Sequence, residues 1–534
     1  MKKIFRIYLL PLLVLLAVSS CKKSFEDLTQ NTNVPNSVPA SLLFNGVLNN
    51  MVDLAGSSSE IYCQYYIYNY NYYGNNTYDF GSGQDYYITL KNVLAMESQA
   101  TASGGAAVNP YEALGKFFRA YLFSKMSMER GDIPMTQALQ GLGNLTPKYD
   151  TQKAVMVQSL AWLESANADL ASLIANPSAA GSGLGGTLSG DIFFNNSLAQ
   201  WQKVVNAFRL RLLIQLSKKA ISDADMNIPA QFAAIIGDAS KYPLLTGSAD
   251  NLQYVYVSPT NYYTQTPDNF GQNGSRQNTS ATYIGLLTSL KDPRVYVTAE
   301  PARYNVDTLH QSPTAFSSFI GADPGLDLGT MYNNAGLQKY SFINRKHYYS
   351  TYTGEPSIQV GYPEQEFNIA EGINRGWAPG NAETHYINGI QASMAYYSVP
   401  TTGTFTAYFY RPGSTTGVKD DANYDKFTIT TDWTSYYAQP AVKYVPGDAG
   451  ITEILQQKYL ALFRHSGLES YYTYRRTKVP TFTTGPGTSN GQRIALRFQY
   501  PSSERTANTA NYNAALASQY GGNDDINGVM WILK

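Results

Sequence analysis

Residues 201–216 read WQKVVNAFRLRLLIQL, and this stretch carries the clearest structural signal of the chain. Its apolar residues recur at intervals of three and four, which predicts a helix with one continuous apolar face. The members of that face are Trp201, Val204, Val205, Phe208, Leu212 and Leu216. A buried helix of this kind needs other helices or a sheet from elsewhere in the chain to cover it.

Similar helical periodicity recurs in separate blocks on both sides of this stretch, at residues 111–122, 156–170, 387–397 and 451–463. Two of these blocks belong to helix pairs. A helix over 364–375 ends before Pro379-Gly380, and Asn381 is placed to cap the next one. Residues 451–464 are followed, after Gly467, by a shorter helix that reaches Arg475.

Residues 251–361 and the segment between the last two blocks are instead rich in Tyr, Thr, Ser, Asn, Gly and Pro. These segments predict long loops with a few short strands. The expected fold class is therefore mainly α, a scaffold of helix pairs decorated by loops. The sequence shows no repeat period and no tetratricopeptide consensus, so a repeat architecture does not follow from it alone.

The first residues predict export. Lys2, Lys3 and Arg6 precede an apolar run at 7–18, which is too short to span a bilayer and is typical of a signal peptide. The run ends in Val-Ser-Ser before Cys21, the pattern at which lipoproteins are cleaved and acylated. We expect a signal peptide at 1–20, a lipid on Cys21, a tether over 21–40 and one domain over 41–534. An ordinary cleaved signal with a coincidental cysteine is the alternative.

Charge and composition narrow the partners. The chain has 39 basic and 39 acidic residues, so it lacks the basic excess that nucleic-acid binding needs. It has 44 tyrosines, whose rings offer an apolar face and a hydroxyl suited to holding polar ligands. With Cys21 assigned to lipid, Cys63 has no partner, and we expect a small buried side chain without a disulfide.

Motifs that would mark an enzyme or a cofactor site are missing from the sequence. Residues 181–186 fit GxGxxG, but no strand precedes them, so we interpret them as a connector. The four histidines lie at no metal-ligand spacing. We expect no catalytic residue, cofactor or metal. One alternative is a calcium loop, because four residues mimic its positions one, three, five and twelve: Asp421, Asn423, Asp425 and Asp432.

Several short strings, in order along the chain, resemble the SusD/RagB family of nutrient-binding lipoproteins. The most specific lie in the last quarter. The strings are Phe25-Glu26-Asp27-Leu28, Arg130-Gly131-Asp132-Ile133-Pro134, Pro147-Lys148-Tyr149-Asp150, Trp201 to Leu216, Asp292-Pro293-Arg294, Glu371 to Met394, Gln456-Gln457-Lys458, Gly467-Leu468-Glu469, Arg475-Arg476-Thr477, Tyr500-Pro501-Ser502-Ser503-Glu504 and Trp531.

The resemblance implies a SusD-like scaffold of tetratricopeptide-like helix pairs that covers a SusC-like, TonB-dependent outer-membrane barrel. The protein would capture an oligosaccharide or a peptide for polysaccharide or peptide utilisation and pass it to the barrel without catalysis. It would be lipid-anchored to the outer membrane and face the cell surface. Surface-exposed relatives often carry an acidic run after the cysteine, whereas this chain has Lys22-Lys23-Ser24. The sequence therefore supports attachment to the outer membrane more strongly than display on the cell surface.

The Tyr- and Asn-rich segment at 62–78 is the first candidate for ligand contact. A sugar ring can stack on a tyrosine, and amides can bond its hydroxyls. We interpret Tyr62 to Tyr68 as core, and the stretch beyond it as an exposed loop whose predicted contacts are Tyr70, Tyr72, Tyr73, Asn75 and Tyr78. A second candidate comprises Tyr262, Tyr263, Phe270 and Arg276, and a third Tyr348, Tyr349 and Tyr352. We interpret Arg475 and Arg476 as structural residues that pair with glutamates.

Two other functions remain open at this point. A lipid-anchored surface glycoside hydrolase or peptidase needs only two well-placed carboxylates, which no spacing in the sequence excludes. A structural outer-membrane lipoprotein would have no small ligand, and its loop aromatics would be buried.

Overall fold

The computed structural model describes residues 38–270, 275–414 and 417–534. Cys21, the predicted signal peptide and nearly all of the predicted tether lie outside the described residues. Within these ranges the chain is mainly helical, with three two-stranded antiparallel sheets. This confirms the fold class predicted from the sequence.

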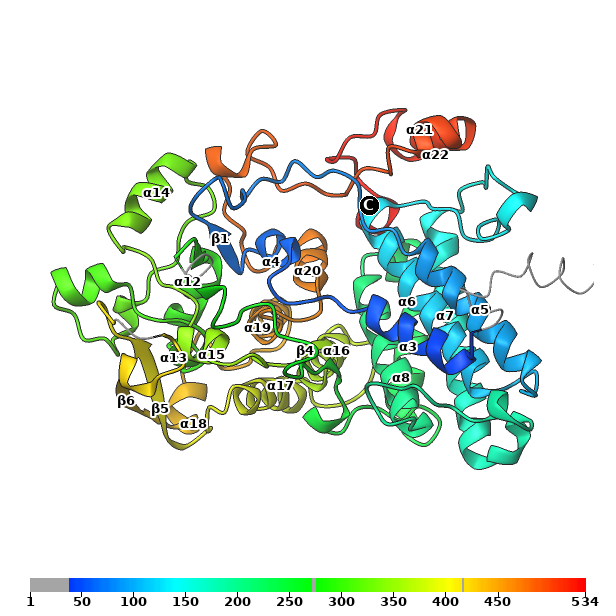
Figure 1. Cartoon of the computed structure of the whole chain (residues 1–534), viewed down its shortest axis with the longest axis horizontal. Coiled ribbons are helices and arrows are strands. Elements are labelled where there is room, and N and C mark those ends of the chain that lie inside the picture. The colour runs from blue at the N-terminus through cyan, green and yellow to red at the C-terminus, as the bar shows by residue number, and fades with distance from the viewer. Residues whose placement is uncertain (1–37, 271–274, 415–416) are drawn as a thin grey trace, which may run out of the picture.

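Long helices form the half of the molecule seen on the right of Figure 1. Successive helices contact each other: α5 packs on α6, α6 on α7, and α7 on α8. The elements of this half are α3 (Ala40–Asn50), α5 (Tyr87–Ala102), α6 (Pro110–Arg130), α7 (Gln152–Ala175), α8 (Leu198–Gln215), α9 (Lys219–Ser222) and α10 (Ile228–Gly237).

Local sequence explains where these helices begin. The side chain of Asn109 accepts hydrogen bonds from the backbone N–H groups of Tyr111 and Glu112, and Pro110 occupies the first turn of α6. Thr151 caps α7 and Ser197 caps α8 in the same way. These caps satisfy N–H groups that the first turn of a helix leaves without a partner.

The predicted apolar stripe of α8 is confirmed, and the helix is buried on its other faces as well. Its polar residues therefore need partners inside the protein. Asn206 Nδ2 donates to Asn167 Oδ1 at 2.9 Å and to the carbonyl oxygen of Pro243 at 3.0 Å. Arg211 forms a buried ion pair with Glu364, which ties α8 to the centre of the molecule.

The centre contains the two helix pairs expected from the sequence. Asn381 caps the second helix of the first pair by accepting from the N–H of Thr384 at 3.3 Å. Arg476 pairs with Glu371 as predicted, whereas Arg475 donates to the carbonyl oxygens of Leu496 and Met128 instead. The helices are α16 (Tyr362–Asn374), α17 (Ala382–Tyr396), α19 (Asp448–Ala461) and α20 (Glu469–Thr477).

The half on the left of Figure 1 combines short helices, most of the strands and long connections, whereas β4 lies at the centre of the view beside α16. β1 pairs with β3, β2 with β4 and β5 with β6. The elements are α4 (Ser58–Tyr62), β1 (Tyr66–Tyr68), β2 (Leu252–Tyr254), β3 (Gln277–Thr279), α12 (Ala281–Ser289), α13 (Val295–Thr298), α14 (Leu328–Gly336), α15 (Arg345–Tyr349), β4 (Ser357–Val360), β5 (Gly403–Tyr410), β6 (Tyr424–Thr431) and α18 (Trp433–Tyr437). Near the C-terminus follow α21 (Glu504–Ala507) and α22 (Thr509–Tyr520).

The expectation of loops with a few strands over 251–361 was therefore incomplete, because this segment also folds into helices. The side chain of Ser280 caps α12 by accepting from the N–H of Thr282, and Tyr283, Ile284 and Leu287 of this helix are buried. Asp327 caps α14 by accepting from the N–H of Thr330 at 2.9 Å. Both helices have only nine residues, so tertiary packing and capping stabilise them more than their composition does.

Cys63 is free and buried, as predicted. Burial raises the pKa of its thiol, because the charged thiolate loses its solvation inside the core. Over the described ranges, none of the helices combines the length and the apolar character that a bilayer span demands.

Candidate ligand-binding site

The tyrosine-rich segment divides between the core and the surface. Tyr65 and Tyr66 are each 1% exposed, and Tyr65 stacks on Tyr459 with ring centroids 4.7 Å apart. This confirms the core interpretation of residues 62–68. Beyond β1 the chain turns outward, and Tyr72 is 81% exposed.

Tyr78 was predicted as a ligand contact, and this prediction is wrong. Its side chain is 1% exposed, and its hydroxyl donates to the carbonyl oxygen of Tyr62 at 3.0 Å. The chain returns to the core at this point because the N–H of Tyr78 donates to the carbonyl oxygen of Thr488 at 2.9 Å. That partner is far away in sequence, so local composition could not reveal it.

Tyr70, Tyr72 and Tyr73 form a surface cluster next to α14, in which Tyr72 is exposed and Tyr70 and Tyr73 are half-buried. The ring of Tyr70 lies 5.3 Å from that of Tyr332, a residue of α14 that is 45% exposed. Tyr72 and Tyr73 meet edge to face at 5.2 Å. The guanidinium of Arg276 lies over the ring of Tyr70 at 5.0 Å. The structure thus brings together two groups that the sequence analysis had treated as separate candidates.

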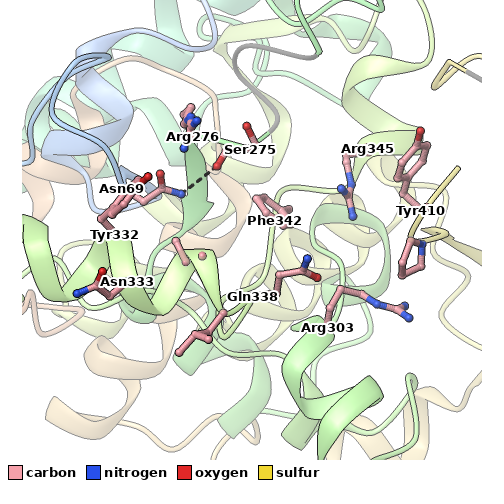
Figure 2. Close-up of a pocket in the computed structure, with 15 residues that line it drawn as sticks. Asn69, Ser275, Arg276, Arg303, Tyr332, Asn333, Gln338, Phe342, Arg345 and Tyr410 are labelled. Carbon is pink, nitrogen blue, oxygen red and sulfur yellow. Dashed lines mark hydrogen bonds between the residues drawn. The ribbon is translucent and has the colours of Figure 1, made fainter. Parts of the chain in front are cut away.

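The pairing of β1 with β3 explains this juxtaposition. Tyr68 is opposite Gln277 in the ladder, and the N–H of Asn69 donates to the carbonyl oxygen of Arg276 at 3.1 Å. The side chain of Asn69 donates to the carbonyl oxygen of Ser275, also at 3.1 Å, as the dashed line in Figure 2 shows. The sheet therefore fixes the start of the Tyr70 loop beside Arg276.

A pocket of about 720 Å³ opens next to this cluster, and we refer to it as the α14 pocket. Its volume lies within the roughly 300–1,000 Å³ that is usual for small-ligand sites. It is lined by Asn69, Ser275, Arg276, Arg303, Tyr332, Asn333, Ala335, Gly336, Leu337, Gln338, Phe342, Arg345, Tyr410, Pro412 and Gly413. Arg276 and Tyr332 lie on one side of it, and Arg345 and Tyr410 on the other (Figure 2).

The second side is held rigidly. Arg345 forms an ion pair with the buried Glu300, and its Nε donates to Glu300 Oε2 at 3.0 Å. Its guanidinium lies 4.8 Å from the ring centroids of both Phe342 and Tyr410. Arg303 pairs with Asp307 through its Nη2, 2.6 Å from Asp307 Oδ1. These contacts fix the side-chain positions before any ligand arrives.

The second sequence candidate is split by the structure. Arg276 lines the pocket, and Phe270 packs behind it, 5.4 Å from the ring of Tyr410. Tyr263 is 1% exposed, so its prediction as a ligand contact is wrong. Tyr262 is 44% exposed, but it pairs with Tyr352 at 4.7 Å and does not line the α14 pocket. Of the third candidate, Tyr348 and Tyr349 are buried.

The calcium interpretation is also wrong. Asp421 pairs with Lys346, Asp425 with Arg411, and Asp432 caps α18. Asn423 Nδ2 donates to the carbonyl oxygen of Gly417. Residues 424–431 form the extended strand β6, which separates positions that a calcium loop would fold around one ion. Among the described residues, no group of three or more His, Cys, Asp or Glu side chains could hold a metal ion.

Sequence reasoning missed most of the pocket. The missed residues with polar or aromatic side chains are Asn69, Ser275, Arg303, Tyr332, Asn333, Gln338, Phe342, Arg345 and Tyr410. They come from separate loops and from the ends of short elements, where no periodic pattern marks a shared surface. The signal that could have identified the region is composition alone, the Tyr, Asn and Arg of the loops next to β3 and α14.

Comparison with known proteins assigns the family. Residues 31–501 match the family model described as starch-binding and associating with the outer membrane. A SusD homologue of Bacteroides fragilis is 30% identical with a TM-score of 0.77, covering 93% of this chain and 100% of that one. A second from the same organism is 29% identical with a TM-score of 0.73 and the same coverage.

More distant structures share the fold. A chitin-binding SusD homologue of Flavobacterium johnsoniae is 19% identical with a TM-score of 0.67, covering 93% of this chain and 98% of that one. No curated protein sequence gives a significant match. The family match spans most of the chain, both helix pairs and the α14 pocket, so the chain belongs to the SusD-like family of outer-membrane-associated, nutrient-binding proteins.

Proposed function

We propose that this protein is an outer-membrane lipoprotein that captures an oligosaccharide in the α14 pocket and passes it to a TonB-dependent barrel. The observation that carries the proposal is the pocket itself, in which aromatic rings and planar polar groups face each other across about 720 Å³. The family is described as starch-binding, which favours a glycan over a peptide as the ligand.

The pocket has the chemistry that a sugar needs. The rings of Tyr332 and Tyr410 offer apolar faces on opposite sides, and the Tyr70 cluster extends the first of them. The side-chain amides of Asn333 and Gln338 have no hydrogen-bond partner within the described part of the chain. They can therefore donate to and accept from sugar hydroxyls without breaking an existing bond.

The same pocket is poorly equipped for hydrolysis. None of the described residues that line it is acidic. Glycoside hydrolysis in most families requires two carboxyl groups on either side of the scissile bond. A role in binding, without turnover, fits these side chains better than the hydrolase alternative does.

The proposal also includes attachment of the protein to the outer membrane and transfer of the ligand to a barrel. Acylation of Cys21 would anchor the protein in the outer membrane, with the α14 pocket at the cell surface. A SusC-like TonB-dependent barrel would accept the ligand. The SusD-like family match supports this arrangement, because the family is described as associating with the outer membrane.

The test is a titration of the mature protein with a panel of oligosaccharides by isothermal calorimetry. The variant Tyr70→Ala/Tyr72→Ala/Tyr73→Ala should bind at least about tenfold more weakly, a loss of about 1.4 kcal/mol. Its melting temperature should change little, because none of the three rings is buried.

Tyr362→Ala is the matched control, since Tyr362 is a partly exposed tyrosine at the start of α16 and lines no part of the pocket. Its affinity should equal that of the wild type. Undiminished affinity in the triple variant would remove the Tyr70 cluster from the site. Absence of binding to every glycan would contradict the proposed function as a whole.

A further inference from the structure

The charge of the α14 pocket is one-sided. Its lining includes Arg276, Arg303 and Arg345 and no aspartate or glutamate. The chain as a whole carries equal numbers of basic and acidic residues, so this concentration of one sign does not reflect composition. The net charge that each arginine brings to the pocket depends on whether an acidic side chain pairs with it.

Two of the three arginines are neutralised within the protein. Arg345 pairs with Glu300, whose side chain is 1% exposed. Arg303 binds Asp307 through two contacts, 2.6 Å from Nη2 to Oδ1 and 3.1 Å from Nε to Oδ2. Their guanidinium groups can still donate to a ligand, but they bring no net charge to it.

Arg276 is different. Within the described ranges, no acidic side chain pairs with it, and it makes no side-chain hydrogen bond. Its guanidinium is held by ring faces alone, 5.0 Å from the centroid of Tyr70 and 5.9 Å from that of Tyr73. Cation–π contacts of this kind position a guanidinium without occupying its N–H donors. Arg276 thus presents a positive charge and free donors beside the ring of Tyr332.

We infer, on the basis of the proposed function, that the α14 pocket selects oligosaccharides that carry a carboxylate, as uronic acids do, and that Arg276 binds this carboxylate. The planar guanidinium matches a carboxylate through two parallel N–H···O bonds. The sugar ring that bears the acid would stack on Tyr332. The aromatic rings below the guanidinium leave its edge available for this contact.

The position of Arg276 and the screening of its charge by salt determine how ligand affinity should depend on ionic strength. Arg276 is half-buried, so its attraction for the ligand should weaken as salt screens it over a Debye length of about 8–10 Å. A neutral sugar would make the same stacking contacts as an acidic one, but it would not form the charge-assisted hydrogen bonds to Arg276. The structure therefore predicts discrimination by charge within one and the same glycan backbone.

The experiment uses matched pairs of ligands. Acidic polysaccharides such as polygalacturonate, alginate and hyaluronan are each compared with their own carboxyl-reduced form, in which every uronic acid becomes the neutral hexose. Binding of the mature protein is measured by affinity electrophoresis and calorimetry at low and at physiological salt. At least one acidic member should bind about tenfold or more tightly than its reduced form, and the difference should shrink with salt.

The substitution Arg276→Gln should remove that difference by lowering affinity for the acidic form about 10- to 100-fold, the range expected for a charge-assisted pair. Affinity for the reduced form should stay within about twofold. Arg276→Lys, which keeps the charge and loses the planar fork, should retain part of the preference. Arg493→Gln, an exposed arginine outside the pocket, makes the same change in net charge and should leave the preference intact.

Each outcome decides something. Equal or tighter binding of neutral glycans, or an unchanged preference in Arg276→Gln, overturns the inference and leaves the proposed oligosaccharide binding in place. Dextran sulfate is added to the panel as a sulfated glycan without carboxylates, and binding of it but of none of the carboxylated glycans would overturn the choice of carboxylate. If neither acidic nor neutral glycans bind, the proposed function fails and this inference fails with it.

Discussion

Asn76 shows how one buried residue shapes the candidate site. It is 2% exposed, its Oδ1 accepts from the N–H of Tyr68 at 2.8 Å, and its Nδ2 donates to the carbonyl oxygen of Tyr68 at 2.8 Å. The side chain thus completes the backbone hydrogen bonds of β1 and closes the loop that carries Tyr70. Asn75 beside it is exposed, and its Oδ1 accepts from the N–H and the hydroxyl of Thr77.

This difference predicts opposite outcomes for two neighbouring substitutions. Asn76→Ala leaves both backbone groups of Tyr68 without a partner and should lower the free energy of unfolding by about 1–3 kcal/mol. Glycan affinity should fall as well, because the Tyr70 loop loses its closure. Chemical denaturation and calorimetry on the same preparations measure both effects.

Asn75→Ala provides the control, with a stability change within about 0.5 kcal/mol. Asn75 also remains a predicted ligand contact, so weaker glycan binding at unchanged stability would support that role. If Asn76→Ala matched Asn75→Ala in stability, the closure we assign to Asn76 would be wrong.

At the scale of elements, the sequence predicts best those helices whose position is set by residues close together in the chain. The stripe of α8 and the pair α16–α17 follow from apolar periodicity and from caps such as Asn381, which act within one turn. The strands β5 and β6 lie in a segment where short strands were expected, whereas the helix α14 was missed because long-range packing selects it. Met331 of α14, for example, is buried in a cluster with Ile67 of β1.

The candidate site could be predicted only in part for the same reason. Tyr70 and Tyr78 lie in the same Tyr- and Asn-rich segment, yet Tyr70 is only half-buried, whereas Tyr78 is buried where its N–H donates to the carbonyl oxygen of Thr488. Arg276 was selected from composition, and its partners Tyr70 and Tyr332 depend on the β1–β3 pairing and on the placement of α14. Composition selected Tyr70 and Arg276 as candidates, and the topology decided which other residues lie beside them.

For the molecule as a whole, His465 links stability to pH. Its ring lies where β4 meets the end of α19, with Nδ1 accepting from the N–H of Ile358 at 3.4 Å. Burial lowers the pKa of His465 to about 4, whereas an unfolded histidine has a pKa of about 6.5. Between these values the unfolded chain binds a proton that the folded protein does not, so stability falls as the pH drops.

The expected contribution is about 2–3 kcal/mol lost between pH 6.5 and 4.5, at roughly 1.4 kcal/mol per pH unit. Urea unfolding of the wild type and of His465→Gln across this pH range measures the contribution of His465 to the free energy of unfolding. The difference in unfolding free energy between the two proteins should be constant from pH 7 to 8 and should narrow or reverse below pH 6.5. If the difference in unfolding free energy between the wild type and His465→Gln were the same at every pH, the pKa of His465 would be the same in the folded and the unfolded protein.

The whole molecule is a helical half, a centre of two helix pairs to which the buried ion pair Arg211–Glu364 ties that half, and a second half that carries the α14 pocket. The measurement that tests this account most directly is a crystal structure of the mature protein with a bound oligosaccharide from the calorimetric panel. We predict sugar density between Tyr332 and Tyr410, with Arg276 contacting the ligand. Density at any other surface, with the α14 pocket left empty at saturating ligand, would contradict the account.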